Sequence, residues 1–356
     1  MCATSPSAAA ELEIDLGAVV ANWRDLCRRH PAGPVAGVVK ANAYGLGVDR
    51  VAPALYEAGC RHFFVAHLAE ALQIRALIPD AMLAVLNGLW PGDAPLYQEH
   101  GILPVLGSLA EIAAWAGPAL LHVDTGMNRL GLAPAELDRL EAEPDLLQGI
   151  ELRYVMTHLA ASEQPDDPAN MLQVRRFAEA CGRLPAAPRS FANSSALFLG
   201  PAFGSDLARP GAALYGVNPT PGQPNPMRPV VRLRARIVQL RDLPRGETVG
   251  YNGTWRASRP SRIGTVSLGY ADGFPRSLSN RAAAAFDGAL VPLVGRVSMD
   301  LATFDLTDAP TARAGDWLEL IGPALPVDEV AARAGTNGYE ILTSLGRRYR
   351  RTYIGA

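Results

Sequence analysis

The sequence predicts an α/β protein in which an N-terminal (β/α)8 TIM barrel is followed by a mainly antiparallel β C-terminal domain. Two observations predict the barrel. Eight short apolar runs alternate with amphipathic helical stretches, and polar side chains follow several of these runs immediately. A third observation marks the second domain, because a proline-rich linker at 218–226 precedes segments in which polar and apolar residues alternate. An open doubly wound sheet is the alternative for the first domain, but Gly45-Leu46-Gly47 lacks the third glycine expected at a dinucleotide site.

The elements follow in order along the chain. A strand is expected at 11–16, where Leu12, Ile14 and Leu16 alternate with polar residues, and helical spacing follows at 18–29. The eight barrel strands are predicted at 35–39, 62–66, 82–86, 102–106, 120–123, 152–156, 190–192 and 212–215. The intervening helices are clearest at 51–58, 68–78, 110–116, 135–141 and 171–180.

Beyond the linker, the second domain opens with strict alternation at 231–237, where Val231, Leu233, Ala235 and Ile237 are separated by arginines. Further strands are predicted at 262–268, 290–297, 301–305 and 317–321, and short helices at 327–334 and 339–347.

The composition argues against several classes of partner. The 356 residues carry a net charge of −2, which gives no reason to expect binding to nucleic acid or to an anionic membrane surface. The N-terminus lacks the basic and apolar regions of a signal peptide, and no apolar run is long enough to span a bilayer. The four cysteines are far apart and fit a reducing compartment. We therefore expect a cytoplasmic, soluble protein.

Lys40 is the only lysine among the 33 lysine and arginine residues. A lysine amine, unlike a guanidinium group, can lose its proton and attack a carbonyl when burial and neighbours lower its pKa. Lys40 follows an apolar run and precedes a glycine-bearing turn, so it is expected at the carboxyl end of a buried strand, where active sites of parallel α/β folds lie. The pattern indicates a Schiff-base lysine, for which pyridoxal phosphate is the common carbonyl partner.

Other polar residues are expected at the same mouth of the barrel. Those that directly follow an apolar run are Lys40, His67, Asn87, Asp124, His158 and Asn193. A phosphate could bind at Asn193-Ser194-Ser195, which also fits an ordinary helix N-cap, or at the backbone of Gly211. His122 and Asp124 form a His-x-Asp pair with no third ligand at useful spacing, so no metal site is expected.

Several long segments resemble the alanine racemases, which are pyridoxal-phosphate enzymes of fold type III. Residues 38–45 are similar to the cofactor attachment motif of that family, and residues 122–131 are similar to its DTGMxRLG segment. Further matches occur in family order at Thr157-His158, Asn193-Ser194, 209–211, 250–251, 269–273, 295–300 and 338–340. The resemblance implies pyridoxal 5'-phosphate as cofactor and interconversion of L- and D-alanine, either to supply D-alanine for peptidoglycan or to use it catabolically. It also implies a division into residues 1–15, which pack with the C-terminal domain, the cofactor-binding barrel at 16–225, and the β domain at 226–356.

The resemblance assigns a two-base mechanism in a homodimer whose active sites lie at the subunit interface. Lys40 would hold the cofactor and act as one acid/base, and Tyr251 of the other subunit would act on the opposite face of the substrate. Arg129 and the backbone N–H of Met299 would bind the substrate carboxylate.

The remaining assignments concern the cofactor. Arg209, oriented by His158, would face the pyridine nitrogen. A guanidinium group only donates hydrogen bonds, so the ring nitrogen would stay unprotonated and the ring would be a weaker electron sink. We infer that an arginine at this position disfavours transamination. The phosphate would be held by Tyr44, Ser194 and Tyr339, by neighbouring Asn193 in the same segment, and by the N–H groups of Gly211 and Ala212. Tyr270 and Asp300 would shape the entrance.

His122 departs from the family pattern. Many alanine racemases have a carbamylated lysine at this position, which pairs with the arginine equivalent to Arg129. Because His122 cannot form that group and no other lysine is available to replace it, another group, such as chloride or a nearby amide, must position Arg129. His122 itself fits a packed strand residue equally well.

Three other functions remain as alternatives. Amino-acid decarboxylases of the same fold type place an acidic residue at the pyridine nitrogen, so Arg209 argues against them. Non-catalytic cofactor-binding barrels usually lack the β domain, and a metal-dependent barrel hydrolase would need a metal. The identity of the substrate's side chain is left open, since related racemases accept serine or larger amino acids.

Overall fold

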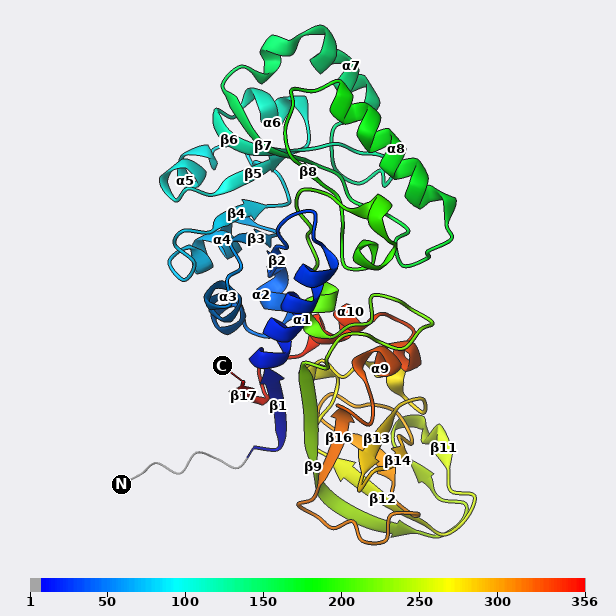
Figure 1. The fold of residues 1–356 in the computed structure, drawn as a ribbon. Coiled ribbons are helices and arrows are strands. Elements are labelled where there is room, and N and C mark those ends of the chain that lie inside the picture. The colour runs from blue at the N-terminus through cyan, green and yellow to red at the C-terminus, as the bar shows by residue number, and fades with distance from the viewer. Residues whose placement is uncertain (1–7, 356) are drawn as a thin grey trace, which may run out of the picture. The chain divides into compact units, whose positions relative to one another are not determined.

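The computed structural model describes residues 8–355, which fall into two compact units (Figure 1). One unit contains Val19–Leu214 and Asn218–Arg228. The other contains the described residues up to Ala18, the segment Tyr215–Val217 and the residues from Pro229 onward. The first seven residues, including Cys2, lie outside the described part of the predicted 1–15 segment.

The first unit is built on a parallel sheet whose strands are neighbours in chain order. Its seven strands are β2 (Gly37–Val38), β3 (His62–Val65), β4 (Met82–Val85), β5 (Leu103–Leu106), β6 (Gly117–His122), β7 (Ile150–Met156) and β8 (Arg189–Ser190). Almost every residue of β3, β4 and β5 is buried, as expected for strands covered on both faces. The predicted α/β architecture with a second, mainly antiparallel domain is confirmed.

The sheet closes into a barrel through the segment 207–210. On one side, the N–H of Leu207 donates to the carbonyl of Arg189 (3.2 Å), and on the other, the N–H of Ala208 donates to the carbonyl of Pro34 (3.1 Å). A parallel bridge between Val35 and Ala208 completes the ring. The segment therefore joins β8 to β2 in the place of an eighth strand.

The predicted position of the eighth strand, 212–215, was wrong. Ala212–Tyr215 forms a 3-10 helix, η4, in which the N–H of Leu214 donates to the carbonyl of Gly211 (3.0 Å). Short buried apolar runs have the same composition in strands and in buried helices, so periodicity could not separate the two. The true segment escaped notice because it contains the charged Arg209 and ends in Pro210.

The helices of this unit lie around the strands (Figure 1). They are α1 (Leu16–Arg29), α2 (Lys40–Tyr44), α3 (Val48–Glu57), α4 (Leu68–Arg75), α5 (Ala94–Glu99), α6 (Leu109–Ala113), α7 (Pro134–Ala142) and α8 (Pro168–Gly182), with α1 beginning in the other unit. Short 3-10 turns lie at η1 (Pro144–Leu147), η2 (Ala196–Phe198) and η3 (Pro201–Phe203). The helices predicted in this unit are all present, while α2 and α5 were missed. The core of the barrel is formed by Ala36, Val38, Phe64, Ala84, Leu103, Val105, Leu120, Met156 and Leu207.

The second unit is a sheet centred on the long strand β9 (Val231–Leu243). The other strands of this sheet are β1 (Ala10–Asp15), β12 (Ser261–Val266), β13 (Ala283–Phe286), β14 (Ala289–Pro292), β15 (Ala302–Asp305), β16 (Trp317–Ile321) and β17 (Arg350–Ile354). Strand β1 lies between β9, to which it is antiparallel, and β17, to which it is parallel. The unit also contains the pair β10 (Thr248–Val249) and β11 (Trp255–Arg256), the helices α9 (Val327–Ala334) and α10 (Gly338–Ser344), and the 3-10 turns η5 (Tyr251–Gly253), η6 (Tyr270–Asp272) and η7 (Arg276–Leu278).

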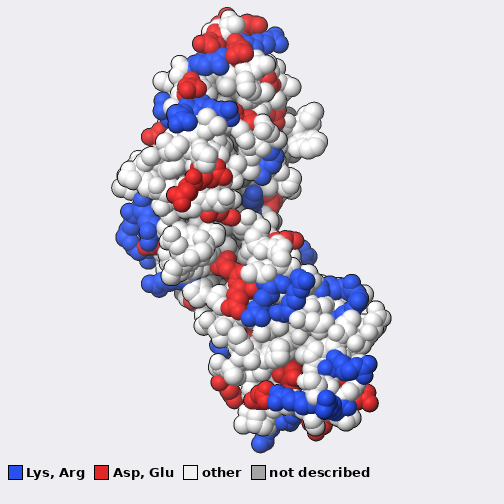
Figure 2. All heavy atoms as spheres, turned by 90° about the vertical axis from the view of Figure 1, so that its right-hand side faces the viewer, with Lys and Arg blue, Asp and Glu red and all other residues white. Residues whose placement is uncertain are grey.

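The alternating pattern of β9 divides its side chains between core and surface. Val231, Leu233 and Ala235 are buried, whereas Arg232 bonds to Glu319 on β16 (2.6 Å) and Arg234 to Glu11 on β1 (3.1 Å). Acidic and basic side chains also lie close together in small groups on the face drawn in Figure 2. The ion pairs of Arg232 and Arg234 with acidic residues on neighbouring strands explain why β9, which is rich in arginine, can be a central strand of the sheet.

Candidate active site

Lys40 directly follows β2 and begins α2, a turn of unusual hand. The next four residues, Ala41 to Tyr44, have φ between 53° and 55° and thus lie in the left-handed region, although none is glycine. Left-handed helical conformation costs about 1–2 kcal/mol per residue for L-amino acids, so the surrounding structure must hold it. Such sustained strain clusters at functional sites, which makes this turn a marker of the site around Lys40.

Side chains and glycines hold the turn at both ends. The carboxylate of Glu70, on α4, accepts the N–H of Ala41 (2.6 Å), and the side-chain oxygen of Asn42 accepts the N–H of Val48 (2.8 Å). Gly45 and Gly47 follow with φ of 83° and 100°, values that glycine adopts without penalty. The turn between Lys40 and the start of α3 is therefore held by specific hydrogen bonds.

The surroundings of Lys40 favour its neutral amine. Burial lowers its pKa from the ordinary value, and the positive charge of Arg129 lowers it further, while the carboxylate of Glu70 acts in the opposite direction. A larger fraction of the amine is thus unprotonated near neutral pH than in an exposed lysine. An unprotonated amine can attack a carbonyl group and can also accept a proton.

Arg209 is a buried cation that bonds to neutral groups. Its Nη1 donates to the hydroxyl of Ser190, and its Nη2 donates to the backbone carbonyl of Thr157 (2.6 Å). Burial lowers the pKa of Arg209 to about 9. No carboxylate pairs with this guanidinium in the part of the chain that the structure describes. Its positive charge therefore remains available to a ligand at the barrel mouth.

Two histidines near Arg209 are held in the neutral form. Burial and the charge of Arg209 lower the pKa of His122 to about 4 and that of His158 to about 3. Arg129, His122 and Lys40 also contribute to the low pKa of His158, so these groups lie within electrostatic range of one another. Within residues 8–355, the structure gives no hydrogen bond between the side chains of His158 and Arg209; Ser190 and Thr157 make those contacts.

Arg129 lies in a loop that is folded around Asp124. The carboxylate of Asp124 accepts the N–H groups of Gly126, Met127 and Asn128 at 2.9–3.2 Å, and Asn128 has a φ of 55°. Asp124 thus fixes the backbone that carries Arg129, whose side chain is exposed. Asp124 was rejected as a metal ligand and this role was not predicted, although aspartates often accept N–H groups two residues further along the chain in turns.

A buried amide network supports the loops after β6 and β7. Gln173, on α8, donates to the hydroxyl of Thr125 and to the carbonyl of His158, both at 3.0 Å, and accepts the N–H of Ala160 (2.8 Å). The hydroxyls of Thr125 and Thr157 are 2.8 Å apart. Sequence analysis did not identify Gln173, because a polar residue in an amphipathic helix is normally read as part of its exposed face.

A hydroxyl and amide cradle lies beside Arg209. The hydroxyl oxygen of Ser194 accepts the N–H groups of Gly211 (3.1 Å) and Ala213 (3.2 Å), so its own hydrogen can be donated to a ligand. A Cβ on Gly211 would lie 2.1 Å from the hydroxyl oxygen of Tyr44, so only glycine allows this approach. Asn193 shapes the cradle by accepting the hydroxyl of Ser162 (2.9 Å) and the N–H of Ala196 (3.0 Å).

The remaining predicted site residues belong to the β unit. Tyr251, at the start of η5, and Met299 expose 68% and 54% of their surface, and Tyr270, in η6, exposes 43%. The loops that carry Tyr270 and Met299 pack closely, because the N–H of Ala271 donates to the carbonyl of Met299 (3.0 Å).

Asp300 and Tyr339 occupy different positions in this unit. The carboxylate of Asp300 accepts a hydrogen bond from Arg348 (2.7 Å), which also pairs with Asp272 (2.7 Å). Tyr339 lies in the first turn of α10 and is half-buried.

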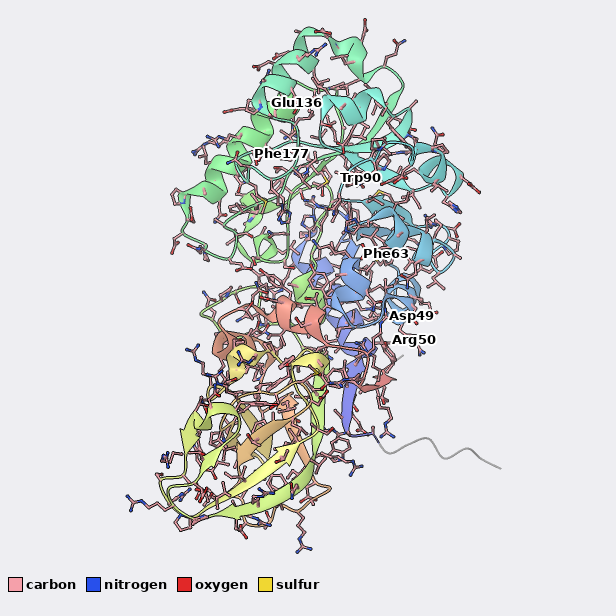
Figure 3. All side chains as sticks on the ribbon, turned by 180° about the vertical axis from the view of Figure 1, so that it is seen from behind. Asp49, Arg50, Phe63, Trp90, Glu136 and Phe177 are labelled. Atoms are coloured by element: carbon pink, nitrogen blue, oxygen red, sulfur yellow. The ribbon has the colours of Figure 1, made fainter. Side chains whose placement is uncertain are left out.

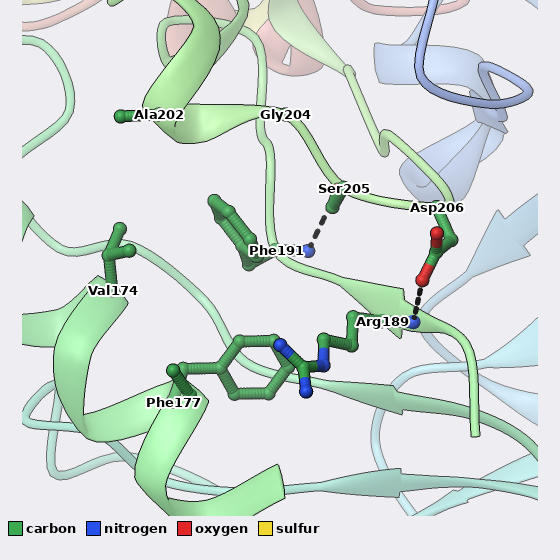
Figure 4. Close-up of a pocket in the computed structure, with 9 residues that line it drawn as sticks. Val174, Phe177, Arg189, Phe191, Ala202, Gly204, Ser205 and Asp206 are labelled. Carbon is green, nitrogen blue, oxygen red and sulfur yellow. Dashed lines mark hydrogen bonds between the residues drawn. The ribbon is translucent and has the colours of Figure 1, made fainter. Parts of the chain in front are cut away.

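A separate cavity of about 430 Å³ lies elsewhere in the barrel unit (Figure 4). Its lining includes Phe177, Arg189, Phe191, Ser205 and Asp206, and the carboxylate of Asp206 accepts the N–H of Arg189 (2.6 Å). Arg189 is the first residue of β8 and Phe191 directly follows that strand, while Phe177 belongs to α8, so the cavity lies along β8 and α8. Lys40 and the cradle follow the carboxyl ends, and none of the predicted site residues lines the cavity.

Two structural features are absent from residues 8–355. No helix in this range is long and apolar enough to cross a membrane. No group of three or more His, Cys, Asp and Glu residues in the same range is arranged to hold a metal ion.

The fold and the site define an α/β barrel that carries a lysine amine of lowered pKa at the carboxyl edge of the sheet, together with a buried arginine and a hydroxyl and amide cradle. Family comparison extends this description to nearly the whole chain. The model of the alanine racemase N-terminal domain matches residues 14–219, and that of the alanine racemase C-terminal domain matches residues 230–353. The chain belongs to the alanine racemase family, whose members are isomerases.

Individual proteins agree with this assignment. The alanine racemase of Acidiphilium cryptum is 60% identical over 96% of this chain and 97% of that protein, and the catabolic alanine racemase of Agrobacterium fabrum is 48% identical over 98% and 92%. The alanine racemase of Bartonella henselae, solved with covalently bound pyridoxal phosphate, superposes with a TM-score of 0.95 at 43% identity, covering 98% of this chain and 100% of that chain. The biosynthetic alanine racemase of Pseudomonas aeruginosa has a TM-score of 0.92 at 36% identity, with the same coverage.

Proposed function

We propose that this protein interconverts L- and D-alanine, using pyridoxal 5'-phosphate attached to Lys40 and a second base from another copy of the chain. The observation that carries the proposal is the position of the single lysine, whose pKa is lowered by burial and by Arg129, at the mouth of the barrel. When bound, the cofactor supplies an electron-withdrawing ring that makes the α-proton of an attached amino acid acidic.

The residues around Lys40 suit each part of this cofactor. The hydroxyls of Ser194 and Tyr44 and the N–H of Ala212 would bind the phosphate. The N–H of Gly211, expected in the same role, donates to Ser194 instead, so Gly211 would contribute by leaving room, while Asn193 orders the segment. We place Tyr339 of the β unit in the same role. His158 would lie beside Arg209 as a neutral imidazole, since its pKa is about 3 as a result of burial and the charge of Arg209.

Arg209 would face the ring nitrogen of the cofactor. Its guanidinium group has only hydrogen-bond donors, and contacts with Ser190 and Thr157 fix two of them. Arg209 could therefore donate a hydrogen bond to the ring nitrogen, but unlike an acidic residue it would not stabilise a protonated ring. With Arg209 at this position the cofactor would withdraw electrons less strongly, and return of a proton to the α-carbon from the flanking residues would be favoured. This choice favours racemisation over transamination and argues against a decarboxylase.

Racemisation needs two groups on opposite faces of the α-carbon, because one must remove a proton and the other must deliver one. Lys40 would serve one face, and Tyr251 of the partner subunit would serve the other. The high exposure of Tyr251 and Met299 in the single chain supports a homodimer in which a second copy covers them. Arg129 and the N–H of Met299 would bind the substrate carboxylate, with Tyr270 and Asp300 at the entrance and His122 beside Arg209 and Arg129.

Three thiols support a reducing compartment. Cys27, Cys60 and Cys181 are all unpaired in the structure, so we propose a cytoplasmic location for the reaction. Whether D-alanine is made for the cell wall or consumed is not a property of the site, since the same residues would catalyse both directions.

The proposal is tested on purified protein. Borohydride reduction followed by peptide mapping should attach the cofactor to Lys40 alone, and the protein should interconvert the alanine enantiomers without releasing CO₂. The Lys40→Ala protein should lose both the attachment and the turnover. Turnover of serine, arginine and lysine enantiomers, measured in parallel, defines how wide the substrate pocket is. Racemisation that survives in Lys40→Ala would refute the mechanism.

A further inference from the structure

Glu70 makes an unusual set of contacts next to Lys40. One carboxylate oxygen accepts the N–H of Ala41 (2.6 Å), and the other accepts the N–H groups of Ala66 (2.8 Å) and His67 (3.1 Å). The side chain is the third residue of α4, and His67 precedes the helix. The last two contacts therefore cap the helix that carries Glu70, while the first reaches the neighbouring loop after β2.

The same arrangement occurs at two other helices of the barrel. Glu111, the third residue of α6, accepts the N–H of Gly107 (2.6 Å) near its own helix and that of Leu89 (3.1 Å) in the loop after β4. Glu136, the third residue of α7, accepts the N–H groups of Ala133 and Leu109, both at 3.0 Å, and lies at the start of that helix (Figure 3). Each carboxylate thus ties the start of its own helix to the preceding βα loop.

What distinguishes Glu70 is the loop to which it bonds. Ala41 is the residue after Lys40 and the first of the four left-handed residues. Its N–H lies in the first turn of α2, where backbone N–H groups have no acceptor inside the helix. Glu70 supplies the missing acceptor. Neither Leu89 nor Leu109, the corresponding partners of Glu111 and Glu136, adjoins a lysine.

Glu70 also affects the charge around the amine. The groups that act electrostatically with Lys40 are Arg129 from the loop after β6, His158 from the loop after β7 and Glu70 from α4. Burial and Arg129 lower the pKa of Lys40, and Glu70 is the one of these groups that raises it. Removal of the negative charge should therefore leave Lys40 protonated over a narrower pH range.

We propose that Glu70 is a positioning residue for Lys40: its carboxylate fixes the left-handed turn through Ala41 and balances the cationic surroundings of the amine. The consequence for turnover rests on the proposed function, whereas the effect on the amine itself does not. Glu70 needs no contact with the substrate or the cofactor to act in this way.

Because Lys40 is the only lysine, its protonation can be followed directly. Cofactor-free protein is labelled with acetic anhydride over a range of pH, and peptide mapping separates the Lys40 peptide from the N-terminal amine. In Glu70→Gln, the charge is lost, and we expect the labelling midpoint of Lys40 to fall by roughly 0.5–1 pH unit. The matched control is Glu111→Gln, which removes the same group from the same helix position and should leave the midpoint unchanged.

Turnover of the cofactor-loaded protein provides the second measurement. We expect kcat to fall about tenfold in Glu70→Gln and the acidic limb of its pH profile to move in the same direction as the labelling midpoint. Equal midpoints and equal pH profiles in Glu70→Gln and Glu111→Gln would overturn the proposal, because Glu70 would then be an ordinary helix clamp.

A conservative variant covers the case in which Glu70→Gln does not fold. Glu70→Asp retains the charge but shortens the reach to Ala41, so the labelling midpoint should stay near that of the wild type while kcat falls. If both values equal those of the wild type, the positioning role is wrong. Failure of the wild-type protein to racemise alanine would overturn the proposed function instead, and the labelling result would still decide the role of Glu70.

Discussion

Ser190 illustrates how much a single hydroxyl can contribute at this site. Its oxygen accepts from the guanidinium of Arg209, and its hydrogen is donated to the carbonyl of Leu207 (2.6 Å), with no exposed surface. Ser190→Ala leaves a buried charged donor without its acceptor, which should lower the free energy of unfolding by about 1–3 kcal/mol and slow racemisation about tenfold. Urea unfolding and an alanine racemisation assay measure the two effects.

A neighbouring serine provides the matched control for Ser190→Ala. Ser205 is also buried and donates to the same carbonyl of Leu207 (3.1 Å), but it does not contact Arg209. Ser205→Ala should reduce stability modestly and leave turnover unchanged. If the two variants have the same turnover, Ser190 does not position Arg209.

His122 gives the site an acid-sensitive component. Burial and Arg209 lower its pKa to about 4 in the folded protein, against a reference value of about 6.5 when unfolded. Between these values the unfolded state binds more protons, so His122 makes the free energy of unfolding fall as the pH drops, at up to roughly 1.4 kcal/mol per pH unit. Its contribution is constant above about pH 7.

The variant His122→Asn should remove this part of the pH dependence. Urea unfolding of the wild type and the variant at several values between pH 4 and 7 should give curves that converge toward acid pH. The exposed His100 supplies the control, since His100→Asn should leave the wild-type pH dependence intact. Parallel curves for wild type and His122→Asn would contradict the prediction.

At the scale of single elements, sequence patterns predicted those whose periodicity is strong. The alternating residues of β9 and the regular sequence of βα units identified both halves of the fold. The strand predicted at 290–297 overlaps β14, but its hairpin partner β13 was missed, although Asp287-Gly288 between two apolar runs is a recognised turn signal, and both residues have positive φ. The hand of α2 could not be predicted, because Ala-Asn-Ala-Tyr has no glycine and its conformation depends on Glu70, which is 29 residues away from Ala41 in the chain.

The left-handed turn makes an unusual prediction about alanine. At Ala41, where φ is 53°, glycine relieves the strain of the Cβ atom, so Ala41→Gly should raise the free energy of unfolding by up to about 1 kcal/mol. The same change at the exposed Ala178, in the right-handed α8, should lower it by about 1 kcal/mol. Urea unfolding of both variants tests the opposite signs, and a loss of stability in both would show that Ala41 is not strained.

For the molecule as a whole, the candidate site could be predicted only in part, because in our proposal its residues come from two chains. The barrel residues converge because parallel strands end at one edge, a rule that a single sequence can exploit. No such rule places Tyr251, whose position in the sequence gives no indication of its partner. Its exposure of 68% is the structural feature that a second subunit would explain.

Subunit mixing tests this assembly. In a dimer of Lys40→Ala with Tyr251→Phe, one site would contain both changes and the other would contain Lys40 and Tyr251 unchanged, since each site draws on both chains. Random exchange of equal amounts makes half of the dimers mixed, so about a quarter of the wild-type activity should return. Each variant exchanged with itself is the control and should stay inactive. If Tyr251 instead served the site of its own chain, no intact site could form, and the mixture would be no more active than its parents.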